Sequence, residues 1–246
     1  MEKLDWWCRD AWIVFIFALG TCAAVWLALG WDALPLGAKG SLLAAIIMPL
    51  HVVEEWKWPA GLHYAYNAII FPKLQPDPGQ LDRFPMSRLT DMFTNVGLVV
   101  VPMVYAGISV ALPFLSTMLA LCMVFFCFGE LFAHTLVGIV SWRRYRPAGN
   151  RAIYSPGLGT SLLLFTPAGL YLCMHLPALV ASDWIGAVAA FVIMFLLCIV
   201  LAEFPLRRWV TRQEPGMFAF PRPQYYARFV DLDAYPQKEV VLNKKG

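Results

Sequence analysis

The stretch AWIVFIFALGTCAAVWLALG, residues 11–30, runs for twenty residues without a charged side chain. A helix of about 20 apolar residues crosses the hydrocarbon core of a bilayer, and this stretch is too long for the apolar part of a signal peptide. In the whole chain 60% of the residues are hydrophobic and only 14% are charged, whereas soluble domains have about 25% charged residues. The sequence therefore predicts an integral membrane protein with a retained first helix.

Five further apolar blocks of membrane-spanning length follow the first. They cover residues 40–57, 91–112, 114–141, 157–178 and 184–204. All six should be helices, because a lipid-exposed backbone must satisfy its hydrogen bonds within the segment. The predicted fold class is an all-α polytopic membrane helix bundle over residues 1–204, followed by a basic cytosolic tail over 205–246 that contains proline and aromatic residues. Residues 60–71, between two prolines, are too few to cross and should be re-entrant or interfacial.

Basic residues are distributed very unevenly between the two sides of this predicted bundle. Eighteen of the 19 Lys and Arg residues fall at the ends and connections on one side, and Lys39 alone falls on the other. Basic loops stay on the cytoplasmic side of a membrane. We therefore expect both termini in the cytoplasm.

Several classes of protein are disfavoured by what the sequence lacks. The six cysteines form no CxxC pair, so neither a disulfide framework nor a zinc ribbon is supported. No glycine-rich phosphate loop and no nucleic-acid recognition motif occur. The expected partner is the lipid bilayer, without nucleic acid and without a nucleotide cofactor.

The second block ends in LHVVEEWKW, residues 50–58, which places ionisable residues inside an apolar helix. His51, Glu54 and Glu55 are related by spacings of three and four, so they share one helical face. A charge held in the hydrocarbon region costs at least about 2.5 to 3.5 kcal/mol. The glutamates therefore need protons, cationic partners or a metal, and by default such residues indicate a functional site.

A second polar set occurs on the fourth block, where Glu130 and His134 are one turn apart and, by residue count, at a depth similar to His51. Asn95 lies near the same level on the third block, one turn after Asp91. We expect His51, Glu54 or Glu55, Asn95 and His134 to line one cavity open toward the cytoplasm. Residues 61–71, which carry His63 and Asn67, should partly close it.

These residues occur in a distinctive order. The pattern comprises His51-x-x-Glu54-Glu55, then Gly61 and Asn67, Asn95, His134, and YSPGLGT at residues 154–160. In this order the residues resemble the HXXEE-domain family of bacterial membrane proteins over about residues 45–175. The resemblance implies a bacterial cytoplasmic membrane protein, but no reaction, because the family's function is undefined. The family pattern usually has a neutral amide where this sequence has Glu130, and it does not include His63.

Three classes of function remain open. The first is a metal-dependent membrane enzyme acting on a lipophilic or membrane-associated small molecule, with zinc, iron or manganese bound by side chains drawn from His51, Glu54, Glu55, His63, Glu130 and His134. Its catalytic groups would be Glu54, Glu55, Asn95 and Tyr154. The second is a metal-free, isomerase-like enzyme that uses the glutamates as acid and base on a lipid-soluble substrate. The third is a transporter or interaction protein with an ion relay.

Simpler structural roles are also open for some of these residues. Glu54 can pair with Lys57, His63 can sit at the headgroups, and Glu203 can pair with Arg207 or Arg208. In YSPGLGT, Ser155 can cap a helix that begins at Pro156, while the Tyr154 hydroxyl and the free amides of that helix start face the site. His175 lies far from the cluster by depth and is excluded from it.

Overall fold

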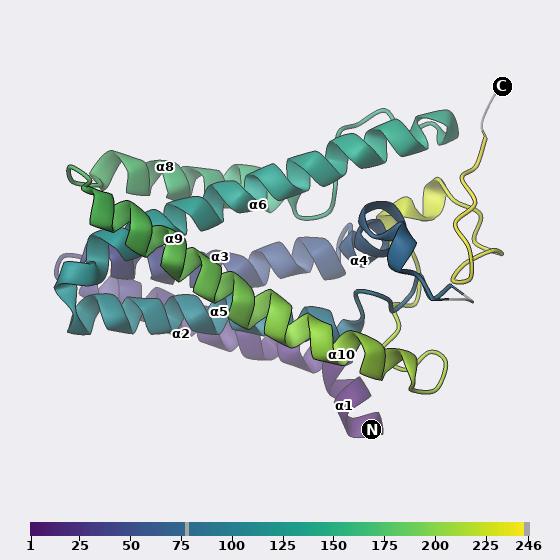
Figure 1. The fold of residues 1–246 in the computed structure, drawn as a ribbon, viewed down its shortest axis with the longest axis horizontal. Coiled ribbons are helices and arrows are strands. Elements are labelled where there is room, and N and C mark those ends of the chain that lie inside the picture. The colour runs from purple at the N-terminus through teal and green to yellow at the C-terminus, as the bar shows by residue number, and fades with distance from the viewer. Residues whose placement is uncertain (77–78, 244–246) are drawn as a thin grey trace.

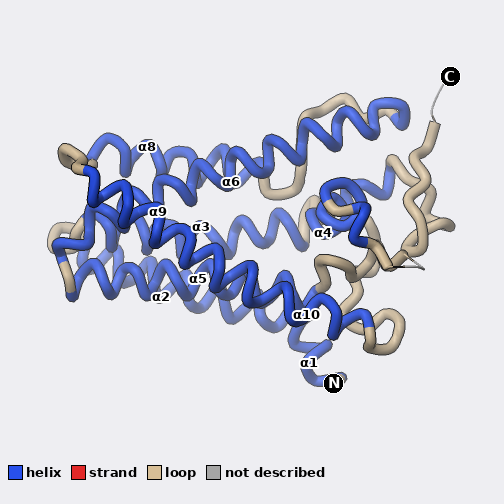
Figure 2. The backbone as a smooth tube through the Cα atoms, in the orientation of Figure 1, coloured by secondary structure: helices blue, strands red, loops and turns tan. Residues whose placement is uncertain are grey.

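The computed structural model describes residues 1–76 and 79–243, and all regular structure there is helical apart from one isolated bridge between Val230 and Val241 (Figure 2). Six helical spans in this part of the chain are long and apolar enough to cross a membrane, which confirms the predicted fold class. The spans are Glu2–Gly30, Leu36–Trp56, Arg88–Ala111, Pro113–Ala148, Leu158–His175 and Ala181–Thr211. They run roughly along one direction and form an elongated bundle (Figure 1).

Ten α-helices make up these spans and one short segment among the described residues. They are α1 (Glu2–Trp6), α2 (Trp12–Gly30), α3 (Leu36–Trp56), α4 (Leu62–Tyr64), α5 (Arg88–Ala111), α6 (Ser116–Tyr145), α7 (Leu158–Thr160), α8 (Thr166–His175), α9 (Ala181–Phe195) and α10 (Leu201–Thr211). Wider π-helical turns join α1 to α2, α7 to α8 and α9 to α10, so each of these pairs forms one span.

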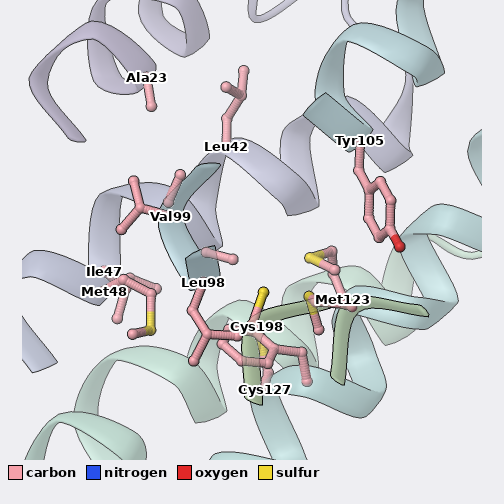
Figure 3. Packing of buried hydrophobic residues seen from close by; sticks show 14 of the residues in the cluster. Ala23, Leu42, Ile47, Met48, Leu98, Val99, Tyr105, Met123, Cys127 and Cys198 are labelled. Atoms are coloured by element: carbon pink, nitrogen blue, oxygen red, sulfur yellow. The ribbon is translucent and has the colours of Figure 1, made fainter. Parts of the chain in front are cut away.

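Helix α3 is the central helix of the bundle, since it packs against α2, α5 and α6. In its most apolar stretch of 18 residues 67% is buried, the largest share of any described span. Small residues on α3 allow this close packing. At Gly40, for example, an added Cβ would lie 2.9 Å from the side chain of Leu172 on α8. Figure 3 shows the resulting core, where Leu42 and Met48 of α3 belong to the same cluster as Val99 and Met123. Polar side chains on α3 are therefore held among neighbouring helices.

The outer surface of the bundle is apolar. On α2, for example, Val14 is 72% exposed and Leu29 is 86% exposed. Leucine and valine so exposed on a span of membrane length are suited to lipid contact. The chain is thus an integral membrane protein whose immediate surroundings are the bilayer.

The two termini lie at the same end of the bundle (Figure 1), as six spans require. The last span continues to Thr211, beyond the residue 204 predicted for its end. The tail then folds back, and Tyr226 and Phe229 pack with Tyr64 and Tyr145 in a second apolar cluster. The short segment after Pro59 forms α4 and a π-helical turn, Ala65–Ile70, and it lies at this end of the bundle rather than across it.

Candidate metal centre

Two neighbouring helices supply the central residues of the site. His51 and Glu55 lie one turn apart on α3, and Glu130 and His134 lie one turn apart on α6. Because α3 packs on α6, these two pairs face each other, and the two imidazole rings meet edge to face with centroids 4.9 Å apart. The helical spacing read from the sequence therefore places all four side chains at one point.

The four side chains converge through a single atom each. His51 Nε2 lies 3.0 Å from Glu55 Oε1 and 3.5 Å from Glu130 Oε2. His134 Nε2 lies 3.2 Å from the same Glu55 oxygen and 3.5 Å from the same Glu130 oxygen. Three of these side chains are buried, while the Glu130 side chain remains 18% exposed. His51, Glu130 and His134 alone offer three ligand atoms within 4.8 Å of one another, a spacing that a single metal ion can bridge.

The Nδ1 atom of His51, on the side of the ring away from the centre, is hydrogen-bonded to Thr160. This contact assigns the tautomer of the ring. The Thr160 hydroxyl donates its one proton to Glu54 Oε2 at 2.6 Å, so its oxygen accepts from His51 Nδ1 at 2.8 Å. With a proton on Nδ1, a neutral His51 presents the Nε2 lone pair to the centre. A carboxylate that orients a ligating histidine through a hydrogen bond is a common feature of metal sites.

Glu54 faces away from the centre and is held by the segment that leads into α7. Its Oε1 accepts from the Tyr154 hydroxyl at 2.7 Å and from the Gly159 amide at 2.9 Å. Its Oε2 accepts from the Thr160 amide at 2.7 Å as well as from the Thr160 hydroxyl. Tyr154 and the free amides of this helix start therefore face Glu54, and a catalytic role for Tyr154 stays a prediction. Four donors stabilise the ionised carboxylate without a cationic partner, so Glu54 anchors the Thr160 support of His51.

His134 has a comparable support from Ser155 and Gly157. The Ser155 hydroxyl donates to the backbone oxygen of His134 at 2.8 Å and lies 3.4 Å from its Nδ1. Gly157 packs directly on the ring, since an added Cβ would come within 2.6 Å of Nδ1. Its φ of +99° also favours glycine. The helix start predicted at Pro156 with Ser155 as its cap is wrong: α7 begins at Leu158, with Gly157 as its N-cap in the left-handed region. The Ser155 side chain bonds His134 instead of capping the helix.

The ion pairs at this centre have only histidine as their basic member. Lys57, which the sequence offered as a partner for Glu54, is paired with Asp10 instead. In the part of the chain that the structure describes, two carboxylates thus meet two imidazoles, and no arginine or lysine is paired with them.

Asn95 and Asp91 form a separate hydrogen-bonded group on α5. Asn95 Nδ2 donates to the Asp91 backbone oxygen at 3.0 Å and to its Oδ1 at 2.9 Å, and Asp91 also accepts from the Trp56 indole. In the described chain the Asn95 side chain is hydrogen-bonded to Asp91 and not to the four central side chains. Its assignment as a catalytic residue stays a prediction without support from the geometry.

His63 lies outside the centre. Its ring stacks on Phe220 of the tail with centroids 3.8 Å apart, and its Nε2 donates to the Arg222 backbone oxygen at 3.1 Å. Burial lowers the pKa of His63 to about 3, so the ring is neutral at pH 7. Asn67 is likewise structural, because its side chain bonds the backbone of Leu81 and Met86. The geometry therefore gives no support to His63 as a metal ligand.

The cavity predicted to be lined by His51, Glu54 or Glu55, Asn95 and His134 stays a prediction. A groove of about 650 Å³ lies beside the centre, and its polar lining comes from Glu54, Tyr154 and Thr160. Two functional contacts were missed in the sequence: Thr160 as the partner of His51, and Gly157 as the support of His134. Both residues lie in YSPGLGT, residues 154–160, which the sequence had already indicated as part of the pattern. Because this segment is about 100 positions after His51, the sequence does not reveal which side chain each of its residues contacts.

Comparison with known protein families gives a match. A family described as proteins of unknown function with an HXXEE motif matches residues 42–172, which contain all four central side chains and their supports. No curated protein and no solved structure matches the chain.

Proposed function

The chain belongs to the family of proteins of unknown function with an HXXEE motif, and we propose that it is a metal-dependent membrane enzyme. One divalent ion is bound by His51, Glu55, Glu130 and His134. The observation that carries the proposal is the convergence of two Nε2 atoms and two carboxylate oxygens at separations of 3.0 to 3.5 Å.

These separations suit metal ligands better than direct ion pairs. Zinc holds nitrogen and oxygen ligands at about 2.0 to 2.2 Å in a tetrahedral site, which places neighbouring ligands roughly 3.3 Å apart. Charge-assisted N–H···O bonds are shorter, about 2.7 to 2.9 Å. Zinc, iron and manganese all accept this mixture of imidazole and carboxylate.

Charge balance is consistent with the same proposal. Two neutral imidazoles and two carboxylates carry a charge of −2, which one divalent ion neutralises. A buried charge without such compensation is strongly destabilising. Glu54 is already stabilised by its four hydrogen bonds, so it does not require the ion.

Glu130 differs from the other three ligands in a way that suits catalysis. It lies 3.5 Å from both histidines, farther than Glu55, and its side chain is the most exposed of the four. Catalytic metal sites keep a position that water or substrate occupies, and the metal lowers the pKa of that water. If a metal is bound, Glu130 is the residue that would hold it most weakly and that would act as a general base beside it.

A metal-free enzyme is the second candidate, because the same contacts also fit two protonated histidines. Imidazolium at both His51 and His134 would balance Glu55 and Glu130, and the protons would serve in acid and base catalysis. The two proposals differ in whether an ion is present, which can be measured directly.

Elemental analysis of protein purified in mild detergent without chelator is the experiment that separates them. We expect near-stoichiometric zinc, iron or manganese in the wild type, and strong depletion in His51→Ala and His134→Ala. His175→Ala is the matched control, because His175 is exposed at the end of α8 and bonds only its own helix backbone; it should keep its metal. Folded wild type without metal would reject the first candidate and favour the second.

We also propose that both termini face the cytoplasm, as the distribution of Lys and Arg indicates. A reporter fused after Gly246 should be active only on the cytoplasmic side. A periplasmic signal would reverse the orientation.

A further inference from the structure

The groove beside the centre lies between α3 and the helix that begins at α7. Its apolar walls are Leu50 and Val53 from one side and Leu163 and Leu164 from the other, with Trp58 at the end of α3. Leu163 is 71% exposed and Trp58 is 80% exposed. Leu50, Leu163 and Leu164 belong to membrane spans, so the groove opens onto the lipid-facing surface of the bundle. Its volume of about 650 Å³ lies within the usual range of about 300 to 1,000 Å³ for small-molecule sites.

The polar and apolar parts of the groove are separated along its length. Glu54 lies two residues before the end of α3, and the next helix, α4, is at the end of the bundle that carries the termini (Figure 1). Tyr154 and Thr160 are hydrogen-bonded to Glu54 and lie at the same level. Leu50 precedes Glu54 by one helical turn, and Leu164 follows Thr160 by one turn, so both lie deeper in the span. This order matches a lipid, whose head lies at the interface and whose chain points into the hydrocarbon core.

The charge of the lining is specific as well. It contains the Glu54 carboxylate and no lysine, arginine or histidine. The four hydrogen bonds that Glu54 accepts stabilise its ionised form. An anionic head group would be repelled there in a medium of low dielectric constant. A neutral head group that donates a hydrogen bond meets the remaining acceptor capacity of the Tyr154 and Thr160 hydroxyl oxygens.

We propose that this groove binds a single-chain lipid with an uncharged hydroxyl head group, which enters from the bilayer. Its head lies against Glu54, Tyr154 and Thr160. Thr160 Oγ1 is 2.8 Å from His51 Nδ1, so the bound head group is separated from a proposed metal ligand by one side chain. That the lipid is the substrate rests on the proposed function, whereas its binding does not.

Photolabelling of the detergent-purified protein tests the binding. The probe is a long-chain alcohol carrying a photoreactive diazirine, and the comparison probe is the fatty acid of the same chain length at a pH where it is ionised. Leu163→Trp narrows the groove. Leu170→Trp is the matched control, because Leu170 is an equally apolar, 50% exposed residue two turns along the same span that does not line the groove.

The alcohol should label wild type and Leu170→Trp equally, at residues of the groove, and the fatty acid should label them weakly. The larger tryptophan side chain should exclude about two methylene groups of the alcohol's chain from the groove, so labelling of Leu163→Trp should be roughly tenfold weaker than that of wild type. Equal labelling of the two tryptophan variants, or labelling by the fatty acid as strong as by the alcohol, would overturn the proposal. Metal content is measured on the same samples: its absence with the labelling pattern intact would overturn the metal centre and support the groove.

Discussion

Buried acids are neutralised differently at the end of the bundle that carries the termini and at the candidate metal centre, which lies between α3 and α6. At the end, Asp5 is paired with Arg88 and Arg9 at 2.8 Å each, and Glu203 is paired with Arg207. At the centre, Glu55 and Glu130 meet His51 and His134 alone. The same fold thus uses arginine in one region and histidine in the other.

The difference between these regions is chemical. Arginine keeps its charge at any physiological pH and never presents a lone pair to a metal. Histidine can lose its proton and ligate through the freed nitrogen. We infer that the arginine pairs stabilise the fold, while the histidine centre holds an ion that can take part in chemistry. The following predictions separate the two roles.

The largest expected effect on stability comes from the arginine region. Arg207→Ala would leave Glu203, which is 2% exposed, without its ionic partner, and breaking a buried pair costs about 3 to 5 kcal/mol. The free energy of unfolding, measured by denaturing-detergent titration in mixed micelles, should fall by that amount, while metal content per folded chain stays unchanged. Arg143→Ala is the control, because Arg143 is exposed on α6. Loss of metal in Arg207→Ala would contradict the separation.

Gly157→Ala should act mainly on the centre. Its new Cβ would displace the His134 ring, and displacing a ligand's support typically lowers metal affinity about 10- to 100-fold. Metal competition with a chelator measures this affinity. Gly216→Ala is the matched control, because Gly216 has a φ of +85° but nothing within 4 Å of an added Cβ, so it shares only the backbone strain. Equal metal affinity in both variants would show that Gly157 does not position His134.

Tyr154→Phe should have a smaller effect of the same kind. It removes one of the four hydrogen bonds to Glu54, which holds Thr160 against His51, so metal affinity should fall by roughly tenfold. Tyr225→Phe serves for comparison: Tyr225 packs its ring on Tyr154 with centroids 5.0 Å apart, but the hydrogen bond to Glu54 comes from Tyr154 and not from Tyr225. An unchanged affinity in Tyr154→Phe would remove Glu54 from the support of the centre.

The smallest effect on the centre is expected from His63. Burial lowers its pKa from 6.5 to about 3, so below about pH 6.5 the unfolded chain gains a proton that the folded chain does not bind. Its contribution to stability is therefore complete above that pH and is lost as pH falls toward 3. His63→Phe, which keeps the stacking on Phe220, should reduce the loss of stability on acidification and retain full metal. Depletion of metal in this variant would restore His63 as a ligand.

Much of the architecture was predictable because lipid imposes simple rules. The lengths of the apolar blocks gave six spans, and the spacing of four between His51 and Glu55 and between Glu130 and His134 gave two faces at one depth. The roles of Glu54 and Glu55 were not predictable. Adjacent positions point about 100° apart around a helix, and only the packing of α6 on one side and α7 on the other decides which carboxylate meets the histidines.

The tail was predicted least well for a related reason. Its prolines and charges indicate solvent exposure, but the aromatic residues among them, such as Tyr226 and Phe229, pack on the short α4 segment and the end of α6. Likewise, the sequence indicated His63 as a metal ligand because it is ionisable and near the motif, but its ring stacks on Phe220. Such contacts join residues more than 80 positions apart, which no local pattern reveals.

Anomalous X-ray scattering from crystals of the wild-type protein tests the central claim most directly. The account predicts one strong peak at the absorption edge of zinc, iron or manganese, placed between His51 Nε2 and His134 Nε2 and about 2.0 to 2.2 Å from each donor atom. A crystal of active protein without any peak there, in which both histidines bond the two carboxylates directly, would contradict it.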